Sequence, residues 1–333
     1  MNTADNNGPF NNGAMSGYEK CTGCGVCTLT CPVWHQTRDI MLTVCGRSRV
    51  LQSGGTPEDM RESITACVLC GACAAVCPAG VDTVGLTTEL RMGLAGAAER
   101  RAPRGSFSAG VKASGKLFFP GAAMRRDGEL MRRAASLLGA DGFALFDDAG
   151  ISGLAGEMEA GIRPEPEELK NFIRSMSGVT EIAAADGFLH RHLRQWLPDV
   201  RVSGLGETLL RKRDIKGALK AGDLYIIETR GYHADHTRLV TFYDRMRLET
   251  GCGLNTSLQR AAIPTGAASR QTAGRLDTAE QARWILHKRR PARIVAESVE
   301  DLEVFKKIPG GPEAVHILEL VPAAAACAKR LTA

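Results

Sequence analysis

Short apolar runs alternate with amphipathic segments over the last two thirds of the chain. The apolar runs predict strands, from the N-terminal side at Leu117–Phe119, Gly142–Phe146, Glu181–Ala185, Leu224–Ile227, Ala261–Pro264, Arg293–Ala296 and Val315–Leu318. The segments with apolar residues at helical spacing predict helices, at Glu129–Leu138, Pro166–Met176, Phe188–Trp196, Val240–Thr250 and Thr278–Lys288. Because strands and helices alternate, this part of the chain is expected to form α/β layers.

The N-terminal third has a different pattern, without alternating strands and helices. Thr56-Pro57-Glu58-Asp59 has the features of a helix start, with a threonine cap, an early proline and acids at the positive end of the dipole. We therefore expect a helix over Glu58–Thr65 and a second over Val84–Gly93. Residues 17–95 are predicted to form a mostly helical domain.

Two segments lack the pattern of packed elements. Residues 1–16 are rich in Asn and Gly and have no apolar core, so they are expected to be a flexible tail rather than a secretory or twin-arginine leader. Residues 96–116 are small, basic and interrupted by Gly and Pro, which favours a linker over a binding patch.

Charge and hydropathy change this picture little. The 333 residues include 42 Lys and Arg against 37 Asp and Glu, a net charge of +5, and the basic residues are dispersed, so no nucleic acid is expected. The longest uncharged apolar stretch, Leu320–Ala328, is far shorter than the roughly 20 residues of a membrane span. A cytoplasmic protein is expected, or one held at the inner face of the membrane by a partner.

Candidate chemistry comes from the cysteines. Two runs read C-x2-C-x2-C-x3-C-P, the bacterial ferredoxin pattern for [4Fe–4S] clusters, and they begin at Cys21 and Cys67. In two-cluster proteins the fourth cysteine of each run binds the other cluster. The first cluster is therefore assigned to Cys21, Cys24, Cys27 and Cys77. The second is assigned to Cys67, Cys70, Cys73 and Cys31.

Other uses of these eight cysteines fit less well. Structural zinc needs paired C-x2-C units or Cys/His mixtures, not two identical quartets. Disulfides are unfavourable in loops this tight, and clustered thiols are typical of a reducing compartment. Three of the eleven cysteines remain, Cys45, Cys252 and Cys327. Cys45, between the two runs, either lines a cluster or is a buried free thiol.

Residues 17–95 resemble the two-cluster module of the heterodisulfide reductase, glycolate oxidase and lactate-utilisation iron–sulfur proteins. The resemblance rests on the two quartets at this separation, on Gly46-Arg-Ser-Arg49 and on Cys77-Pro-Ala-Gly-Val-Asp82. It covers about a quarter of the chain. It implies electron transfer through two [4Fe–4S] clusters.

The remaining chain resembles the cysteine-rich CCG repeats that follow this module in that family. Phe118-Phe-Pro-Gly121 and Tyr225-Ile-Ile-Glu-Thr-Arg230 stand where two such repeats would open, which implies repeats over residues 117–215 and 216–333. The cysteines that these repeats use are missing here, since Cys252 and Cys327 lie outside the expected turns. The resemblance therefore implies a degenerate pair of repeats kept for docking, without a cluster of its own.

Three functions remain open from the sequence. The preferred one is an electron-transfer subunit of a multi-subunit oxidoreductase, with a flavoprotein and a heterodisulfide-reductase-like or quinone-linked membrane subunit as the partners that the resemblance implies. The alternatives are a catalytic subunit acting on a heterodisulfide or a 2-hydroxy acid, and a redox-sensing interaction module. No catalytic residue is assigned.

Two histidine pairs are further candidates. His233 and His236, with Asp235, could form a metal or flavin contact, although a loop or helix-start role is the commoner one. His190 and His192 alternate with arginines, which predicts a solvated helix face.

Overall fold

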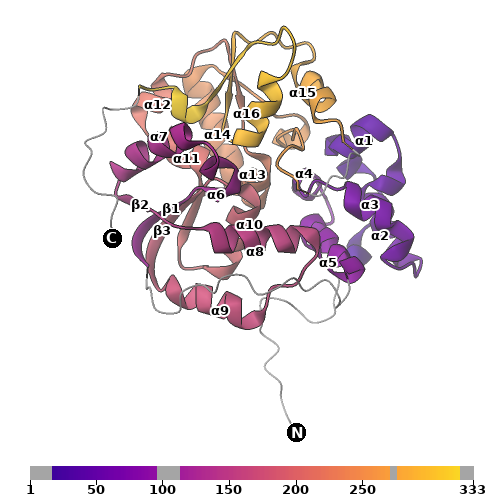
Figure 1. The fold of residues 1–333 in the computed structure, drawn as a ribbon. Coiled ribbons are helices and arrows are strands. Elements are labelled where there is room, and N and C mark those ends of the chain that lie inside the picture. Colours follow the sequence, from indigo (N-terminus) through magenta and orange to yellow (C-terminus); the bar gives the residue numbers. More distant parts are fainter. Residues whose placement is uncertain (1–16, 96–112, 271–275, 323–333) are drawn as a thin grey trace.

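The computed structural model describes residues 17–95, 113–270 and 276–322 (Figure 1). The predicted tail over residues 1–16, most of the predicted linker and Cys327 lie outside these ranges. Within them, no helix is long and apolar enough to cross a membrane.

Residues 17–95 form the helical domain that the sequence predicts. Its 3-10 helices are η1 (Tyr18–Lys20), η2 (Val26–Thr30), η3 (Ile40–Leu42) and η4 (Glu58–Met60). Its α-helices are α1 (Pro32–Thr37), α2 (Val44–Gln52), α3 (Arg61–Ala66), α4 (Ala72–Ala75) and α5 (Thr83–Ala95). At the start of α2, the Thr43 hydroxyl accepts from Gly46 N and so caps the helix. Val44, Leu51, Ile64 and Leu90 are among the residues of a small apolar core between these helices.

The first α/β unit contains a four-stranded parallel sheet of order β2-β1-β3-β4. Its strands are β1 (Ser114–Phe119), β2 (Phe143–Leu145), β3 (Gly178–Ala184) and β4 (Arg201–Gly204). Its helices are α6 (Gly121–Arg125), α7 (Gly128–Gly139), α8 (Ala149–Ala160), α9 (Pro166–Ser175), α10 (Gly187–Trp196), α11 (Leu205–Leu210) and α12 (Arg213–Gly217).

The second α/β unit repeats this arrangement, with the parallel strand order β6-β5-β7-β8. Its strands are β5 (Asp223–Ile226), β6 (Gly253–Leu254), β7 (Arg293–Ala296) and β8 (Glu313–His316). Its helices are α13 (Thr229–Ala234), α14 (His236–Thr250), η6 (Leu258–Arg260), α15 (Thr278–Leu286), α16 (Val299–Lys306) and η7 (Ile317–Glu319). The two sheets have the same topology, as two successive repeats would, while their relation to CCG repeats stays a prediction.

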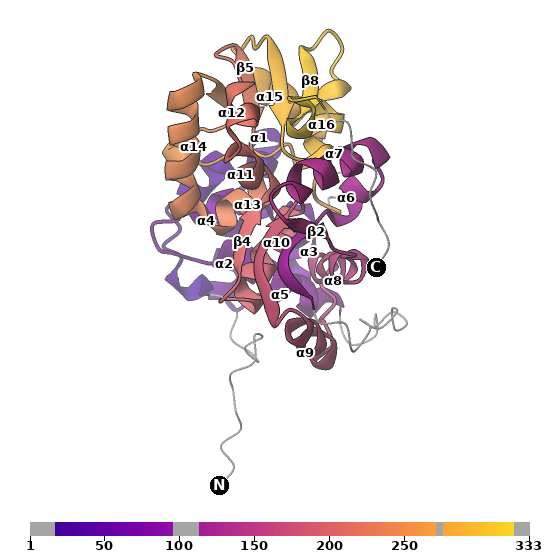
Figure 2. The same ribbon diagram turned by 90° about the vertical axis from the view of Figure 1, so that its left-hand side faces the viewer.

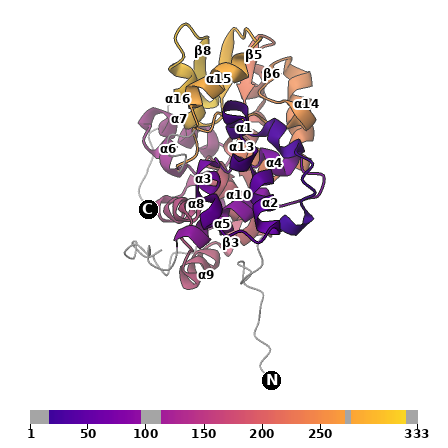
Figure 3. The ribbon, with the colours of Figure 1, turned by 90° about the vertical axis from the view of Figure 1, so that its right-hand side faces the viewer.

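The three parts pack against one another. Figure 2 shows the second sheet above the first, and one apolar cluster joins them, with Phe118 and Leu209 from the first unit and Tyr225 and Val295 from the second. Figure 3 shows the helical domain in front of α10 and α13. Leu69, in the second cysteine run, is buried in the core of the first α/β unit. The helical domain is therefore anchored to the α/β body.

Two details of the sequence prediction are wrong. Ala261–Pro264 is not a strand, because its backbone bonds mainly to the neighbouring loop: Ile263 N donates to Asn255 O at 2.7 Å, and Ala262 makes only an isolated bridge. The fourth strand of the second sheet is β6 instead. His190 and His192 do not lie on a solvated face, because both rings are buried: His190 lies next to Gly231 of α13, and His192 packs against the rings of Phe188 and Trp196.

Candidate metal centre

The two cysteine runs adopt the same backbone path. Gly25 and Gly71, each directly after the second cysteine of its run, have φ of 74° and 77°, in the left-handed region that favours glycine. The residues directly before these second cysteines also have a positive φ, 74° at Gly23 and 52° at Leu69. The third cysteine then stands in a short helix in both runs, Cys27 in η2 and Cys73 in α4. The sequence repeat is therefore also a structural repeat.

The structure brings the two runs together, because α4 packs against η2. A cavity between them is lined by five cysteines, Cys27, Cys31, Cys67, Cys70 and Cys73. Burial raises the pKa of Cys31, and the charge of Cys67 raises it further, because Cys31 lies near the second run. Burial raises the pKa of Cys73 to about 12, with the charge of Cys67 as the next cause. The thiols of Cys31 and Cys73 would be protonated at neutral pH without a metal to bind them.

The thiols of the first run are more open. Cys24 is exposed, while Cys21 and Cys27 are half-buried, and both of these pack with Cys77 against the apolar core of the helical domain. Cys45 is a buried thiol that forms a hydrogen bond with Cys21, so it lies next to this group. Burial raises the pKa of Cys45, and Cys21 raises it further. Cys45 is thus both a buried thiol and a neighbour of the first run.

Cys67 is half-buried, and its pKa is lowered. Burial raises that pKa, but the guanidinium groups of Arg47 and Arg91 outweigh the effect of burial and lower it. The two arginines come from α2 and α5, which flank the cavity. They make the second run a place where negative charge is favoured.

Arg47 is a buried cation for which the described protein residues supply no anionic partner. It is 2% exposed, and it donates only to neutral acceptors, such as Ser63 O at 2.7 Å, Ser63 Oγ at 3.1 Å and Thr87 Oγ1 at 3.3 Å. Its Nε has no partner in the described part of the chain, and no described carboxylate pairs with it. A buried cation costs much free energy unless an anion is near. A cluster held by four thiolates is such an anion, so the residues fit a [4Fe–4S] group here.

Three backbone carbonyls of the second run accept hydrogen bonds from side chains of other elements. Arg91 on α5 donates to Cys67 O at 2.5 Å, and Arg230 on α13 donates to Val68 O at 3.1 Å. His233 Nδ1, also on α13, bonds to Cys70 O at 2.7 Å. We refer to these three bonds as the carbonyl contacts of the second run. They fix the loop through residues distant in the sequence.

A buried carboxylate completes this network. Glu159 on α8 pairs with Arg230 at 2.8 Å, and its backbone oxygen accepts from Arg91 Nη1 at 2.6 Å. Burial raises the pKa of Glu159, but the charge of Arg230 outweighs this effect and lowers it. The carbonyl contacts and Glu159 together connect both α/β units to the cysteine cavity.

His233 does not have a free nitrogen for a metal ion. Nδ1 bonds to Cys70 O, and Nε2 accepts from Ala262 N at 3.1 Å, so Nδ1 carries the proton. Burial lowers the pKa of His233 to about 3. The ring therefore positions the second run. In the described ranges, no group of three or more Cys, His, Asp or Glu is arranged to hold a single metal ion; a cubane, whose corner ligands lie farther apart, does not require one.

The sequence does not single out Arg91 and Arg230, and it predicts His233 only as a metal or flavin contact or a helix-start residue, not as a partner of the second run. Arg47 lies in the Gly46-Arg-Ser-Arg49 stretch, but an arginine in an exposed-looking sequence gives no sign that it is buried. Arg230 and His233 lie far from the cysteine runs in the sequence, and Arg91 lies outside the cysteine pattern. Only the tertiary packing of α5 and α13 reveals them.

Comparison with known proteins supports this description. Residues 17–81 match the family described as the 4Fe-4S dicluster domain, and this segment contains both cysteine runs. The chain is therefore an iron–sulfur protein. More particularly, its N-terminal part is a dicluster domain, which by its description holds two [4Fe–4S] clusters. The searches of curated proteins and of solved structures gave no significant match.

Proposed function

We propose that this chain is an electron-transfer subunit of a multi-subunit oxidoreductase. Two [4Fe–4S] clusters supply the chemistry, the acceptance and release of single electrons. The observation that carries the proposal is the packing of the two cysteine runs around one cavity, lined by five of their cysteines, beside Arg47, a buried cation without a carboxylate partner in the described chain. The dicluster match supports the same role.

The ligand sets of the proposal are those predicted from the sequence. Cys21, Cys24, Cys27 and Cys77 hold the first cluster, and Cys67, Cys70, Cys73 and Cys31 hold the second. The proximity of Cys31 to Cys67 and Cys70 supports this crossed arrangement.

The protein residues insulate one site and leave the other accessible. The carbonyl contacts and the α/β units cover the second run, whereas Cys24 in the first run is exposed. Leu29, Ile40 and Met41 are exposed apolar side chains of the same domain. We therefore propose that a redox partner approaches at the first run. The family resemblance suggests a flavoprotein as this partner.

The α/β units are proposed to serve docking and insulation. In the sequence, residues 117–333 contain only Cys252 and Cys327, too few thiolates for a third four-cysteine cluster. Cys252 is buried and bonds to Met246 Sδ and Thr250 Oγ1, away from the cysteine cavity. This observation favours electron transfer over a catalytic cluster in this half.

The test is an anaerobic affinity purification from the native cell, with iron analysis and EPR of the recovered complex. We expect eight irons per copy of this chain and a co-purifying flavoprotein. More than eight irons would favour a catalytic subunit. An isolated chain whose clusters are lost on reduction would contradict the proposal and favour a sensor.

The ligand assignment has its own test in a pair of serine variants. Cys77→Ser is expected to remove the EPR signal of the first-run cluster, and Cys31→Ser that of the second, because each serine takes one thiolate ligand from the cluster that the other run holds. Cys252→Ser, at a buried thiol away from the cysteine cavity, is the matched control and should leave both signals in place. Loss of the second-run signal alone in Cys77→Ser would show that the ligands are not crossed.

A further inference from the structure

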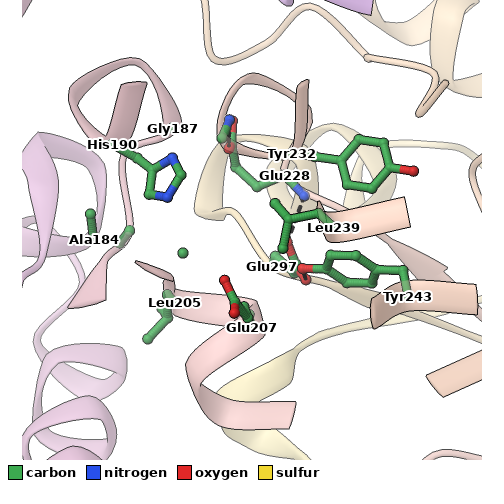
Figure 4. A pocket seen from close by; sticks show the side chains of 14 residues that line it. Ala184, Gly187, His190, Leu205, Glu207, Glu228, Tyr232, Leu239, Tyr243 and Glu297 are labelled. Carbon is green, nitrogen blue, oxygen red and sulfur yellow. Dashed lines mark hydrogen bonds between the residues drawn. The ribbon is translucent and has the colours of Figure 1, made fainter. Parts of the chain in front are cut away.

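A small cavity lies where the carboxyl ends of the two sheets meet. Ala184 and Gly204 end β3 and β4 on one side, while Glu228 and Glu297 follow β5 and β7 on the other. Figure 4 shows His190 and the carboxyl groups around it. The space open to the centre of a water molecule is about 20 Å³, which suits one water rather than a substrate. No cysteine lines this cavity.

His190 is the clearest sign that the cavity holds a ligand. It is 1% exposed, and neither of its ring nitrogens has a partner in the described ranges. Buried polar groups almost always have a hydrogen-bond partner, from protein or from ordered water. Both nitrogens without a protein partner therefore point to a molecule inside the cavity.

Glu228 and His190 face the same space beside Gly231. The Glu228 carboxyl accepts from the backbone N–H of Arg230 at 3.0 Å and of Gly231 at 2.7 Å. A Cβ on Gly231 would stand 2.9 Å from Glu228 Oε2 and 3.2 Å from His190 Nδ1. One water-sized molecule beside this glycine can therefore reach both polar groups.

His190 is neutral at neutral pH. Burial, followed by the charge of Arg194, lowers its pKa to about 4. Glu207 and Asp235 act in the opposite direction, and Arg238 adds to the lowering. A neutral ring offers one N–H and one lone pair, so it can both donate to and accept from a trapped water.

Glu228 holds a proton at neutral pH. Burial raises its pKa to about 8, although two backbone N–H groups and the charge of Arg230 lower it, and Asp186 raises it further. Glu297, on the opposite wall, accepts from the Tyr225 and Tyr243 hydroxyls and from Glu228 N. Burial raises the pKa of Glu297 to about 7. The cavity thus contains acid groups that titrate near physiological pH.

Helix α13 joins this cavity to the second cysteine run. Glu228 caps its start and Gly231 lines the cavity, while Arg230 and His233 make two of the carbonyl contacts. An added negative charge raises the proton affinity of an acid nearby. A change of charge at the second run is therefore expected to act on Glu228.

We propose that the cavity is a proton-binding site in which one trapped water bridges Glu228 and His190, and that the site takes up a proton from solvent when the second cluster accepts an electron from the redox partner. This inference rests on the proposed function. The electron stays on the cluster. Where Glu228 is ionised, from about pH 8 upward, the proton adds to its carboxylate, so the two added charges offset each other.

The coupling is tested by EPR-monitored redox titration of the intact, cluster-containing chain between about pH 6 and pH 10. By linkage, a tenfold rise in proton affinity on reduction places the acid limit of the second-cluster potential about 59 mV above its alkaline limit. In the wild type, we expect the reduction potential of the second cluster to fall with rising pH, with the midpoint of this fall slightly above pH 8. Glu228→Gln should remove it, whereas Glu313→Gln, an equal charge change at an exposed site, should retain it. A flat wild-type curve, or the same slope in Glu228→Gln, overturns the coupling.

The site itself is tested without reduction. The infrared spectrum of the oxidised chain at pH 7 should contain a carboxylic-acid band that Glu228→Gln removes. The ring nitrogens of His190, labelled with ¹⁵N in the wild-type chain, should shift as the pH passes through 8. Absence of both signals overturns the site. Absence of any cluster signal counts against the proposed function and the coupling together, whereas a cluster signal with a pH-independent potential counts against the coupling alone.

Discussion

Arg47 shows at the scale of one residue how a site can be recognised by an unbalanced charge. The structure surrounds this cation with carbonyl and hydroxyl oxygens and with the cysteine cavity. Arg49, two residues further along α2, is exposed and bonds to Gln52 instead. Arg47 and Arg49 therefore provide a buried and a solvated positive charge on the same helix, whose effects can be compared.

Arg47→Met is expected to lower the reduction potential of the second-run cluster. A buried positive charge stabilises the more negative, reduced state, and Coulomb's law at an effective dielectric of about 20 gives an effect on the order of 100 mV. Arg49→Met is the control, with little effect expected because water screens an exposed charge. EPR-monitored redox titration measures both. Equal shifts in the two variants would contradict this account of Arg47.

Gly71 and Gly25 offer a matched pair for the second prediction. Both have a left-handed backbone, so an alanine at either position costs about 1–3 kcal/mol. A Cβ on Gly71 would in addition stand 2.9 Å from Cβ of His233, whereas one on Gly25 would meet nothing within 4 Å. Gly71→Ala should therefore lose about 1–3 kcal/mol more stability than Gly25→Ala. Chemical denaturation of both variants measures the difference, and equal losses would show that α13 does not press on the second run.

Helix α13 is the element on which the site depends most. It has only six residues, yet it contributes Arg230 and His233 to the carbonyl contacts and Gly231 to the cavity between the sheets. So short a helix is not stable alone, and its position is fixed by packing and by the buried pair of Arg230 with Glu159.

Arg230→Met is expected to destabilise the chain by about 3–5 kcal/mol, because it leaves Glu159 buried without its cation. The double change with Glu159→Met should recover part of this loss, since no buried charge then remains unpaired. Lys170→Met, which breaks an exposed pair with Glu167, is the control and should change stability little. Denaturant titrations decide the point. A double variant as unstable as Arg230→Met would show that the charge pair is not the cause.

Much of the element pattern followed from the sequence, for local reasons. Asp277 was predicted to cap a helix, and it accepts from Ala279 N and Glu280 N at the start of α15. Ala261–Pro264 was predicted as a strand because it is apolar, but apolar runs in buried loops have the same composition. Helix α8 was not predicted, since its small and apolar residues show no clear polar face. Burial without periodicity is the common cause of these errors.

The molecule as a whole is expected to become less stable as pH rises from about 4.5 to about 7 through Glu297. Its pKa is raised from 4.5 to about 7 by burial, so the folded state keeps a proton that the unfolded chain releases. This difference corresponds to about 3 kcal/mol, which is lost over that interval and stays lost above it. Glu297→Gln should remove this contribution from the dependence of unfolding free energy on pH. Parallel curves for the wild type and the variant would contradict it.

The candidate site was predictable only in its ligands. The spacing of the eight cysteines is a local pattern, and it indicated two clusters before any tertiary structure was known. The arginines and His233 that surround the second run are separated from it by up to 163 residues. The local sequence of Arg91 and Arg230 does not distinguish them from surface residues, and that of His233 does not indicate a contact with the second run. Such contacts depend on how the three parts of the molecule pack.

The carbonyl contacts also have a consequence for the order in which the protein matures. A ribosome completes both cysteine runs while Glu159, Arg230 and His233 have not yet been synthesised. The second run at that stage lacks the groups that hold Val68 O and Cys70 O in place. Iron and sulfide delivered early would therefore meet an unfinished binding loop. Cluster insertion is best timed after release of the full chain, and a truncated chain ending before α13 should retain iron poorly in its second site.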